Sequence, residues 1–185
     1  SVGKSDHKVN LDTCSLTTDI DTFTGTRAND TFSGVTGEVG VSTLNTGDIL
    51  DGAGGTNTFN VTGNGNGEGN EPLVETNNIQ NVFVRSVADT TIDQALMSGV
   101  VNAASNGSTA ATTFTGADLS TKYWIIDSIN TADGNANLTV NYAEASGSDD
   151  TAMLAVQNAG GKFGSTNVTQ TITTTAESGD IEAIS

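Results

Sequence analysis

The chain has very few basic residues. Only 6 of its 185 residues are Lys or Arg, against 22 Asp or Glu, and the formal net charge is −16 at pH 7. Lys and Arg supply most of the attraction to nucleic acids and to anionic membranes. We therefore expect no nucleic acid partner. The acidic excess suits a chain that stays soluble or one whose charge is neutralised by bound cations.

Cysteine and histidine are nearly absent. Cys14 is the only cysteine, so no internal disulfide is possible, and bound metal is one other source of stability. His7 is the only histidine and lies in a terminal segment, so any Ser-His-Asp or Cys-His arrangement would depend on it alone. Carboxylates are plentiful, but they lie in turns without an aromatic cleft around them. We therefore expect that the protein is not an enzyme.

Long hydrophobic runs are also missing. No apolar run approaches the roughly 18 residues needed to span a bilayer, so we expect no membrane insertion, and no secretory signal opens the chain. Instead, the hydrophobic residues, 35% of the chain, fall in short alternating runs, which favour strands over disorder. The candidate strands after residue 72 are 79–85, 100–104, 112–115, 123–127, 138–142, 153–157, 168–174 and 181–184.

The spacing of these strands indicates the fold class. They recur about every 10 to 20 residues between turns rich in Gly, Asn, Ser and Asp. This predicts an all-β fold, either a β-solenoid-like stack (a parallel β-roll or β-helix) or a β-sandwich of short strands. Residues 91–104 are the exception, because Ile92, Leu96 and Val100 follow a helical spacing. We expect one or two helical turns there, or alternatively another rung of the stack.

The only proline marks a division of the chain. Residues 64–71, NGNGEGNE, form a polar glycine-rich stretch that Pro72 closes, so 64–72 is expected to be a flexible loop. This loop separates an N-terminal segment, 1–63, from a repetitive strand stack, 73–185. We expect the two parts to be continuous as one domain.

Two glycine-rich turns dominate the N-terminal segment. One covers 25–32, GTRANDTF, and the other covers 51–59, DGAGGTNTF; Gly25 and Gly52, the first glycines of the two turns, lie 27 positions apart. Glycine lets a backbone turn tightly and bring its carbonyls close to a ligand. Carboxylate and amide oxygens beside such a turn are the hard ligands that Ca²⁺ takes.

Both turns are degenerate copies of the Ca²⁺-binding nonapeptide of parallel β-rolls, G-G-x-G-x-D-x-U-x. The first turn keeps the aspartate as Asp30. The second has Asn57 in place of the aspartate and Ala53 in place of a glycine. The apolar position that follows each turn should point into a core, so we expect Phe23, Phe32 and Phe59 to be largely buried.

Seven oxygen-bearing side chains around these turns are candidate calcium ligands. They are Asp19, Asp21, Asn29, Asp30, Asp48, Asp51 and Asn57. Asp19 and Asp21 are two positions apart, so on a strand both carboxylates would leave the same face, and like charges held that close call for a cation. The alternative is that these residues form Asx-turns, which need no metal. The pair Asp149 and Asp150 is interpreted as a solvated turn.

One further pair of aromatic residues is open to two interpretations. Trp124, the only tryptophan, follows Tyr123 in the apolar run YWII. Sugar binding is the functional interpretation of this pair. Packing of the indole against a rung is the structural one, and we favour it because amphipathic aromatic side chains fill cores well.

The N-terminal segment resembles a family of secreted proteins. The two stretches LTTDIDTFTGTRANDTFSG (16–34) and TLNTGDILDGAGGTNTFNV (43–61) are similar to a recurring opening of bacterial S-layer and repeats-in-toxin-like proteins. The resemblance implies calcium binding, an extracellular or cell-surface location, and export by a route that needs no N-terminal signal. It covers about a third of the chain.

These observations together lead to an expected function. We expect a non-enzymatic, calcium-stabilised structural protein of the S-layer type, which forms sheets or filaments with itself because short strands leave open edges. Cell-surface polysaccharide is a further expected partner. Two alternatives remain: a decoration protein on a virion surface, and a calcium-binding or glycan-binding module of a larger exported adhesin or hydrolase.

Overall fold

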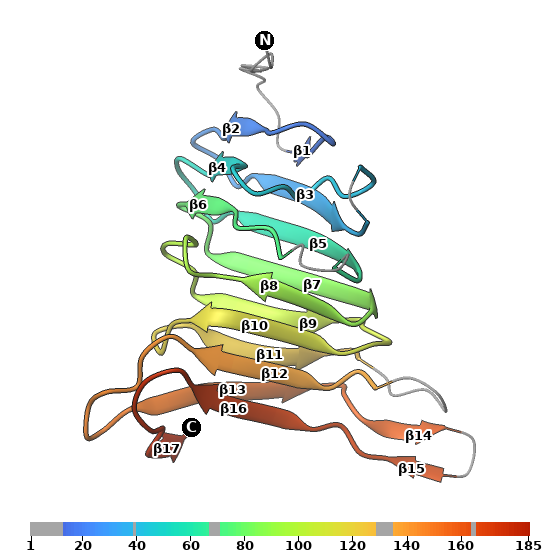
Figure 1. Ribbon diagram of the computed structural model, residues 1–185, viewed down its shortest axis with the longest axis vertical. Helices are drawn as coiled ribbons and strands as arrows, with labels where there is room; N and C mark the ends of the chain where they lie inside the picture. Colours follow the sequence, from blue (N-terminus) through green and yellow to red (C-terminus); the bar gives the residue numbers. More distant parts are fainter. Residues whose placement is uncertain (1–12, 39, 67–70, 129–134, 164–165) are drawn as a thin grey trace.

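In a computed structural model, the chain forms a parallel β-solenoid (Figure 1). The structure describes residues 13–38, 40–66, 71–128, 135–163 and 166–185, and for 161–163 and 166–168 it describes only the backbone. These residues form strands and turns and contain no helix, so none of them could cross a membrane as a helix. The all-β prediction is confirmed, and the parallel pairing identifies a solenoid rather than a sandwich. His7, in residues 1–12, lies outside the described part.

The longest sheet runs along the whole stack. Its strands, in spatial order, are β1 (Thr13–Ser15), β3 (Thr31–Thr36), β5 (Thr58–Asn64), β7 (Asn81–Ala88), β9 (Asn102–Asn106), β11 (Lys122–Ile126), β13 (Thr151–Gln157) and β17 (Ala183–Ile184). All neighbours pair in parallel. The chain therefore leaves the sheet after each strand and returns one position further along, as stacked rungs require.

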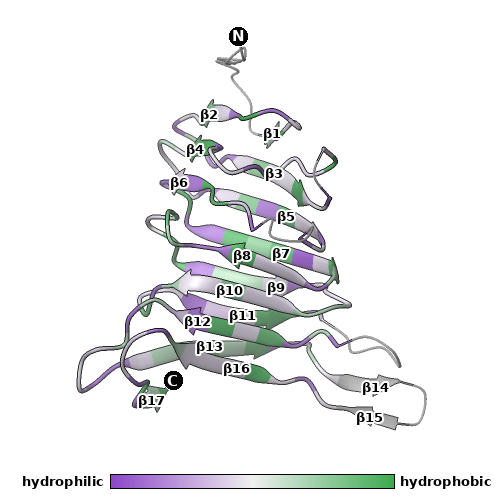
Figure 2. Cartoon of the chain, in the orientation of Figure 1, coloured by the Kyte–Doolittle hydropathy of each residue, from purple (hydrophilic) through white to green (hydrophobic). Residues whose placement is uncertain are grey.

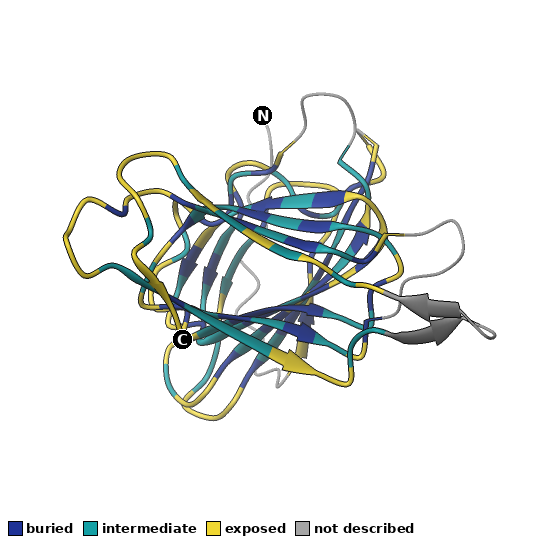
Figure 3. Cartoon of the chain, turned by 90° about the horizontal axis from the view of Figure 1, so that it is seen from below, coloured by how far each residue is buried: buried dark blue, intermediate teal, exposed yellow. Residues whose placement is uncertain are grey.

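The intervening strands form the other sides of the solenoid. The first group is β2 (Thr22–Thr24), β4 (Ile49–Asp51) and β6 (Glu75–Asn77), and the second is β8 (Thr90–Asp93), β10 (Thr112–Ala117), β12 (Leu138–Tyr142) and β16 (Ile172–Ala176). A short antiparallel pair, β14 (Gly161–Phe163) and β15 (Thr166–Val168), projects from the side of the stack (Figure 1). Viewed from one end, the sheets surround a common interior, and buried and part-exposed residues alternate along the strands (Figure 3).

The core is built from residues in register on successive rungs. Along the eight-stranded sheet one row of inward residues is Cys14, Phe32, Phe59, Val82, Ala103 and Tyr123. The Tyr123 ring meets Phe114 and Tyr142 from the facing strands, with centroids 5.5 and 5.7 Å away. Because inward residues are in register from rung to rung, hydrophobic segments recur on successive strands (Figure 2). Each fully buried Val or Phe side chain in this row contributes roughly 1.5–3 kcal/mol to the stability of the folded chain.

The predicted phenylalanine core is confirmed at two of three positions. Phe32 and Phe59 are completely buried, whereas Phe23 is only half-buried. The difference follows from position: Phe23 lies in β2, the outermost strand of its three-stranded sheet, so it has a neighbouring rung on one side only within that sheet.

The helical interpretation of residues 91–104 is wrong, and its alternative, another rung, is correct. The segment begins in β8 and ends in β9, and Leu96, which a helix would bury with Ile92, is exposed. Gly99, with a left-handed φ of +79°, lies in the turn between the two strands. Strand 168–174 divides into β15 and β16, and the other predicted strands each overlap one observed strand.

The glycine-rich loop does not interrupt the stack. β5 ends at Asn64 and β6 begins at Glu75, and residues 67–70 lie outside the described part. β5 and β7, the strands of the long sheet on either side of the loop, pair directly with each other. The sheet is therefore continuous across the expected division at 64–72.

Candidate metal centre at the glycine turns

Four of the seven candidate ligands are buried at two corners of the solenoid. Asp21 and Asp48 come directly before β2 and β4, and Asp30 and Asn57 come directly before β3 and β5. All four are at most 4% exposed. Their separation of 27 residues within each corner is one turn of the solenoid, since the strands that follow them pair in register.

At each corner the carboxylate closes its own turn. The Thr17 amide donates to Asp21 Oδ2 at 2.6 Å, and nine residues later the Thr26 amide donates to Asp30 Oδ2 at 2.7 Å. The two threonine hydroxyls donate to the same carboxylates at 3.1–3.2 Å. These are local side-chain-to-backbone motifs of the kind that stabilise a turn without metal.

The same side chains connect successive rungs. The Asp21 amide donates to Asp48 Oδ1 at 2.9 Å, and the Asp30 amide donates to Asn57 Oδ1 at 2.8 Å. The Asn57 amide in turn donates to Gln80 Oε1 at 2.8 Å. Sequence analysis missed Gln80, although its position directly before a strand is the one that Asp30 and Asn57 also occupy.

The Asn57 side chain donates hydrogen bonds to the backbone carbonyls around its turn. Its Nδ2 donates to three carbonyl oxygens, those of Gly52 (3.0 Å), Gly54 (2.9 Å) and Asn78 (2.7 Å). This nitrogen carries only two hydrogens, so the three carbonyl oxygens share them. The three oxygens converge on one point and make it electronegative. The positive end of the amide dipole therefore occupies the place that a cation would take between two turns.

The Asp30 turn presents a different arrangement of the same groups. A Cβ placed on Gly25 would lie 2.6 Å from Asp30 Oδ2 and 2.9 Å from the carbonyl oxygen of Gly52. A carboxylate oxygen and a carbonyl oxygen of the next rung therefore approach Gly25 so closely that no side chain fits there. Both are oxygen types that Ca²⁺ takes, but Ca²⁺ needs six to eight oxygen ligands and Asp30 Oδ2 already accepts hydrogen bonds from the Thr26 amide and hydroxyl, so these two oxygens are only part of a calcium donor set.

Three other candidates lie outside the buried corners. Asp19 and Asn29 are exposed, and Asp51 is half-buried. The expectation that Asp19 and Asp21 share one strand face is wrong, because β2 begins only at Thr22 and Asp21 turns inward while Asp19 stays in solvent.

Asn29 and Asp51 instead accept hydrogen bonds within a turn and from the next rung. Asn29 Oδ1 accepts from the Thr56 amide at 2.8 Å, and Asp51 Oδ1 accepts from the Ala53 amide and from Asn78 Nδ2, both at 2.8 Å. In the part of the chain that the structure describes, no group of three or more His, Cys, Asp or Glu side chains is placed to hold a metal ion. Any calcium site there would have to combine one or two carboxylates with backbone oxygens.

Asp48 is the most electrostatically perturbed carboxylate of these corners. Burial raises its pKa to about 6, while hydrogen bonds from the Asp21 and Asn45 amides act in the opposite direction and the Asp21 carboxylate adds to the increase. A buried carboxylate of this kind is costly when charged. It is therefore a point at which the stability of the turns depends on pH.

Comparison with known proteins does not place the chain in a family: no family model, curated protein or solved structure matches it. The molecule is defined here by its fold and its turns, as a parallel β-solenoid with buried polar corners.

Proposed function

We propose that the protein is a non-enzymatic structural component of an extracellular surface layer, and that copies assemble through the end of the solenoid formed by β13, β16 and β17. The observation that supports this proposal is an unpaired strand edge at this end of the described stack. β17 pairs with β13 only at Thr151 and Ala152, and β16 is the last strand of its sheet. Unpaired edges of parallel strands accept a further strand.

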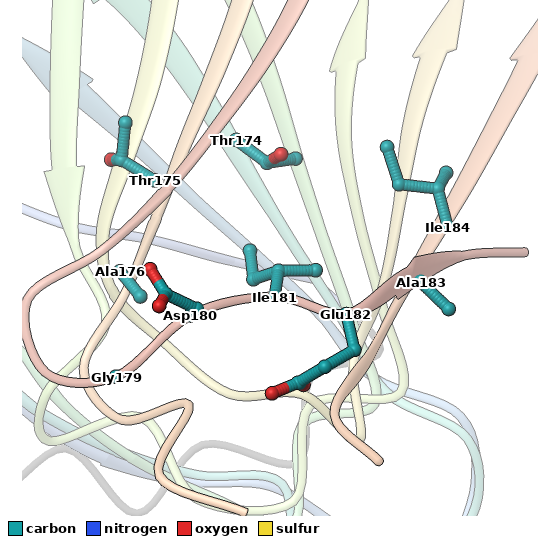
Figure 4. Close-up of a pocket in the computed structure, with 9 residues that line it drawn as sticks. All are labelled: Thr174, Thr175, Ala176, Gly179, Asp180, Ile181, Glu182, Ala183 and Ile184. Carbon is teal, nitrogen blue, oxygen red and sulfur yellow. The ribbon is translucent and has the colours of Figure 1, made fainter. Parts of the chain in front are cut away.

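This end also exposes apolar surface. Val156 and Ile184 are 62% and 65% exposed, and Ile172 and Ile181 are only partly buried. A hollow of about 530 Å³ lies here, with Thr174, Thr175 and Ala176 of β16 along one side and the chain from Gly179 to Ile184 along the other (Figure 4). A rung cannot bury its apolar face alone, so a following rung would stabilise this end.

A second copy of the chain is the occupant that we propose. A rung from another copy, added in parallel, would continue both the hydrogen-bond ladder and the apolar interior. Repulsion between chains of net charge −16 opposes this contact. Calcium would reduce the repulsion, which makes assembly dependent on divalent cations.

Calcium also has a proposed place within the chain. We infer that Asp30 Oδ2 and the Gly52 carbonyl contribute to one Ca²⁺ site, whereas the Asn57 amide replaces the ion in the next turn. Support comes from the close approach of both oxygens to Gly25 and from the three carbonyls around Asn57 Nδ2.

The test is sedimentation velocity and electron microscopy of the purified chain, first with millimolar calcium and then with EGTA. We expect sheets or filaments with calcium and dispersal with chelator. The double variant Val156→Lys/Ile184→Lys should stay monomeric, whereas Val41→Lys should assemble like the parent. Val41 is a matched control because it is 67% exposed and lies between β3 and β4, several rungs away from β17. A parent chain that is monomeric in both buffers would overturn the proposal, as would normal assembly of the double variant.

A further inference from the structure

The outer face of the eight-stranded sheet carries two aromatic side chains. In β11, Tyr123 points into the core, whereas Trp124 lies on the outer face and is only half-buried. Tyr123 therefore packs in the core, and Trp124 lies against the neighbouring rung on the outer face, where its Nε1 donates to Asn102 Oδ1. Phe83 of β7 is likewise half-buried on the outer face.

Phe83 and Trp124 belong to one row across the sheet. Phe83 is in register with Ala104, and Ala104 is in register with Trp124. Ala104 occupies an outward position of β9 but is completely buried. Its complete burial shows that neighbouring side chains cover it, and the strands that carry the two rings lie two strand spacings apart, about 10 Å.

Two hollows meet at Phe83. The smaller, of about 210 Å³, is lined by Phe83, Trp124 and Ile126 together with the amides of Asn81, Asn102 and Gln157. The larger, of about 460 Å³, is lined by Phe83 with the polar side chains of Asn60, Arg85, Asn106 and Asp127. Phe83 lines both hollows, so they are neighbours on the outer face of the sheet, and together they are called the groove.

The groups in the smaller hollow are held in place by hydrogen bonds. Asn102 Nδ2 donates to Asn81 Oδ1 at 3.1 Å, and Trp124 Nε1 donates to Asn102 Oδ1, also at 3.1 Å. The Lys122 Nζ atom lies 4.7 Å from the centroid of the indole ring. The indole and the amides are therefore oriented before any ligand arrives, which reduces the entropic cost of binding.

We propose that this groove binds a neutral carbohydrate chain. Sugar rings combine apolar C–H faces, which stack on aromatic rings, with hydroxyls, which pair with planar amide, guanidinium and carboxylate groups; the groove supplies both. The acidic chain disfavours polyanions. An apolar peptide would leave the polar lining without partners. The groove lies along the side of the stack and shares only Gln157 with the strands of the proposed assembly end, so most of it stays free when copies assemble.

The single tryptophan allows a site-specific test. Trp124 fluorescence would be recorded while laminarin, hydroxyethyl cellulose, xylan and galactomannan are titrated separately, in the Val156→Lys/Ile184→Lys background, so that assembly does not interfere. We expect a saturable change with at least one polymer. The variant Phe83→Ala should weaken binding at least tenfold, which corresponds to about 1.4 kcal/mol.

Trp124→Ala, which has no tryptophan fluorescence, is tested by affinity gel electrophoresis in the same polymers. It should lose retardation, whereas Thr173→Ala on the opposite sheet should be retarded like its parent. Circular dichroism checks that each variant is folded. The proposal is overturned if none of the four polymers changes the fluorescence or retards the chain, or if folded Phe83→Ala and Trp124→Ala variants bind as their parent does.

Discussion

At the scale of single residues, the buried corners place an amide and a carboxylate at equivalent positions of successive rungs. Asn57 presents an N–H₂ group to three carbonyls, whereas Asp30 presents a carboxylate oxygen to the corresponding space one rung earlier. The amide supplies its own positive end and needs no cation. The carboxylate adds negative charge to neighbouring carbonyl oxygens and gains from a cation.

This difference predicts opposite effects of two substitutions. Asn57→Asp would replace the three hydrogen bonds that Asn57 Nδ2 donates to carbonyls with repulsion between oxygens, so without calcium it should destabilise the chain by several kcal/mol, and with calcium much of this loss should be recovered. Asp30→Asn should weaken calcium binding and change the stability of the metal-free chain little. Calorimetric titration and chemical denaturation with and without EGTA measure both. If Asp30→Asn binds calcium like the parent, the inferred site is wrong; Asp149→Asn, an exposed change, is the control.

A second prediction at this scale concerns pH. The pKa of Asp48 is raised to about 6 in the folded chain, above its ordinary value of 3.8, so the folded state binds the proton more tightly than the unfolded state. Protonation thus stabilises the fold: the cost of the buried charge is complete above pH 6 and is relieved as the pH falls from about 6 towards 4.

Denaturation in EGTA should measure this contribution by comparison of the parent with Asp48→Asn. When the pH falls from 7 to 4, the unfolding free energy of the parent should rise by on the order of 2 kcal/mol relative to that of the variant. A difference in unfolding free energy that is constant over this range would show that Asp48 titrates normally.

At the scale of strands, stability depends on how many rungs cover a side chain. Phe59 in β5 has paired strands on both sides, whereas Phe23 in β2 is at the edge of its sheet. Phe59→Ala should therefore lower the free energy of unfolding by roughly 3–5 kcal/mol, and Phe23→Ala by clearly less. Urea denaturation of the two variants tests the order. Equal losses would mean that the edge of the stack is packed as tightly as its middle.

At the scale of the whole molecule, calcium should act on one cooperative stack. Binding to the native state alone stabilises by about 2.7 kcal/mol at a hundredfold excess over Kd. For a chain of this size each kcal/mol corresponds to roughly 2–4 °C in Tm. Millimolar calcium should therefore raise Tm by several degrees and EGTA should reverse the change in thermal scans. Identical melting curves would indicate that side-chain hydrogen bonds alone hold the turns.

Local pattern was sufficient for the strands and for the positions of the turns. Alternation with a period of two residues and glycine beside each turn are properties of neighbouring residues, so Phe32, Phe59 and most strands of the second half could be predicted from the sequence. The same local rules identified Asp30 and Asn57 as polar positions of tight turns, but their burial came only from the structure.

Contacts between rungs were decided only by the tertiary structure. The run YWII alternates large residues on both faces, so sequence parity alone could not show that Tyr123 enters the core and Trp124 faces outward. The bonds from Asn57 to Asn78 and Gln80 join residues 21 and 23 positions apart, and they depend on the register of stacked strands. Register is set by the packing of all rungs together, because a shift of one residue would exchange the buried and exposed faces of a strand.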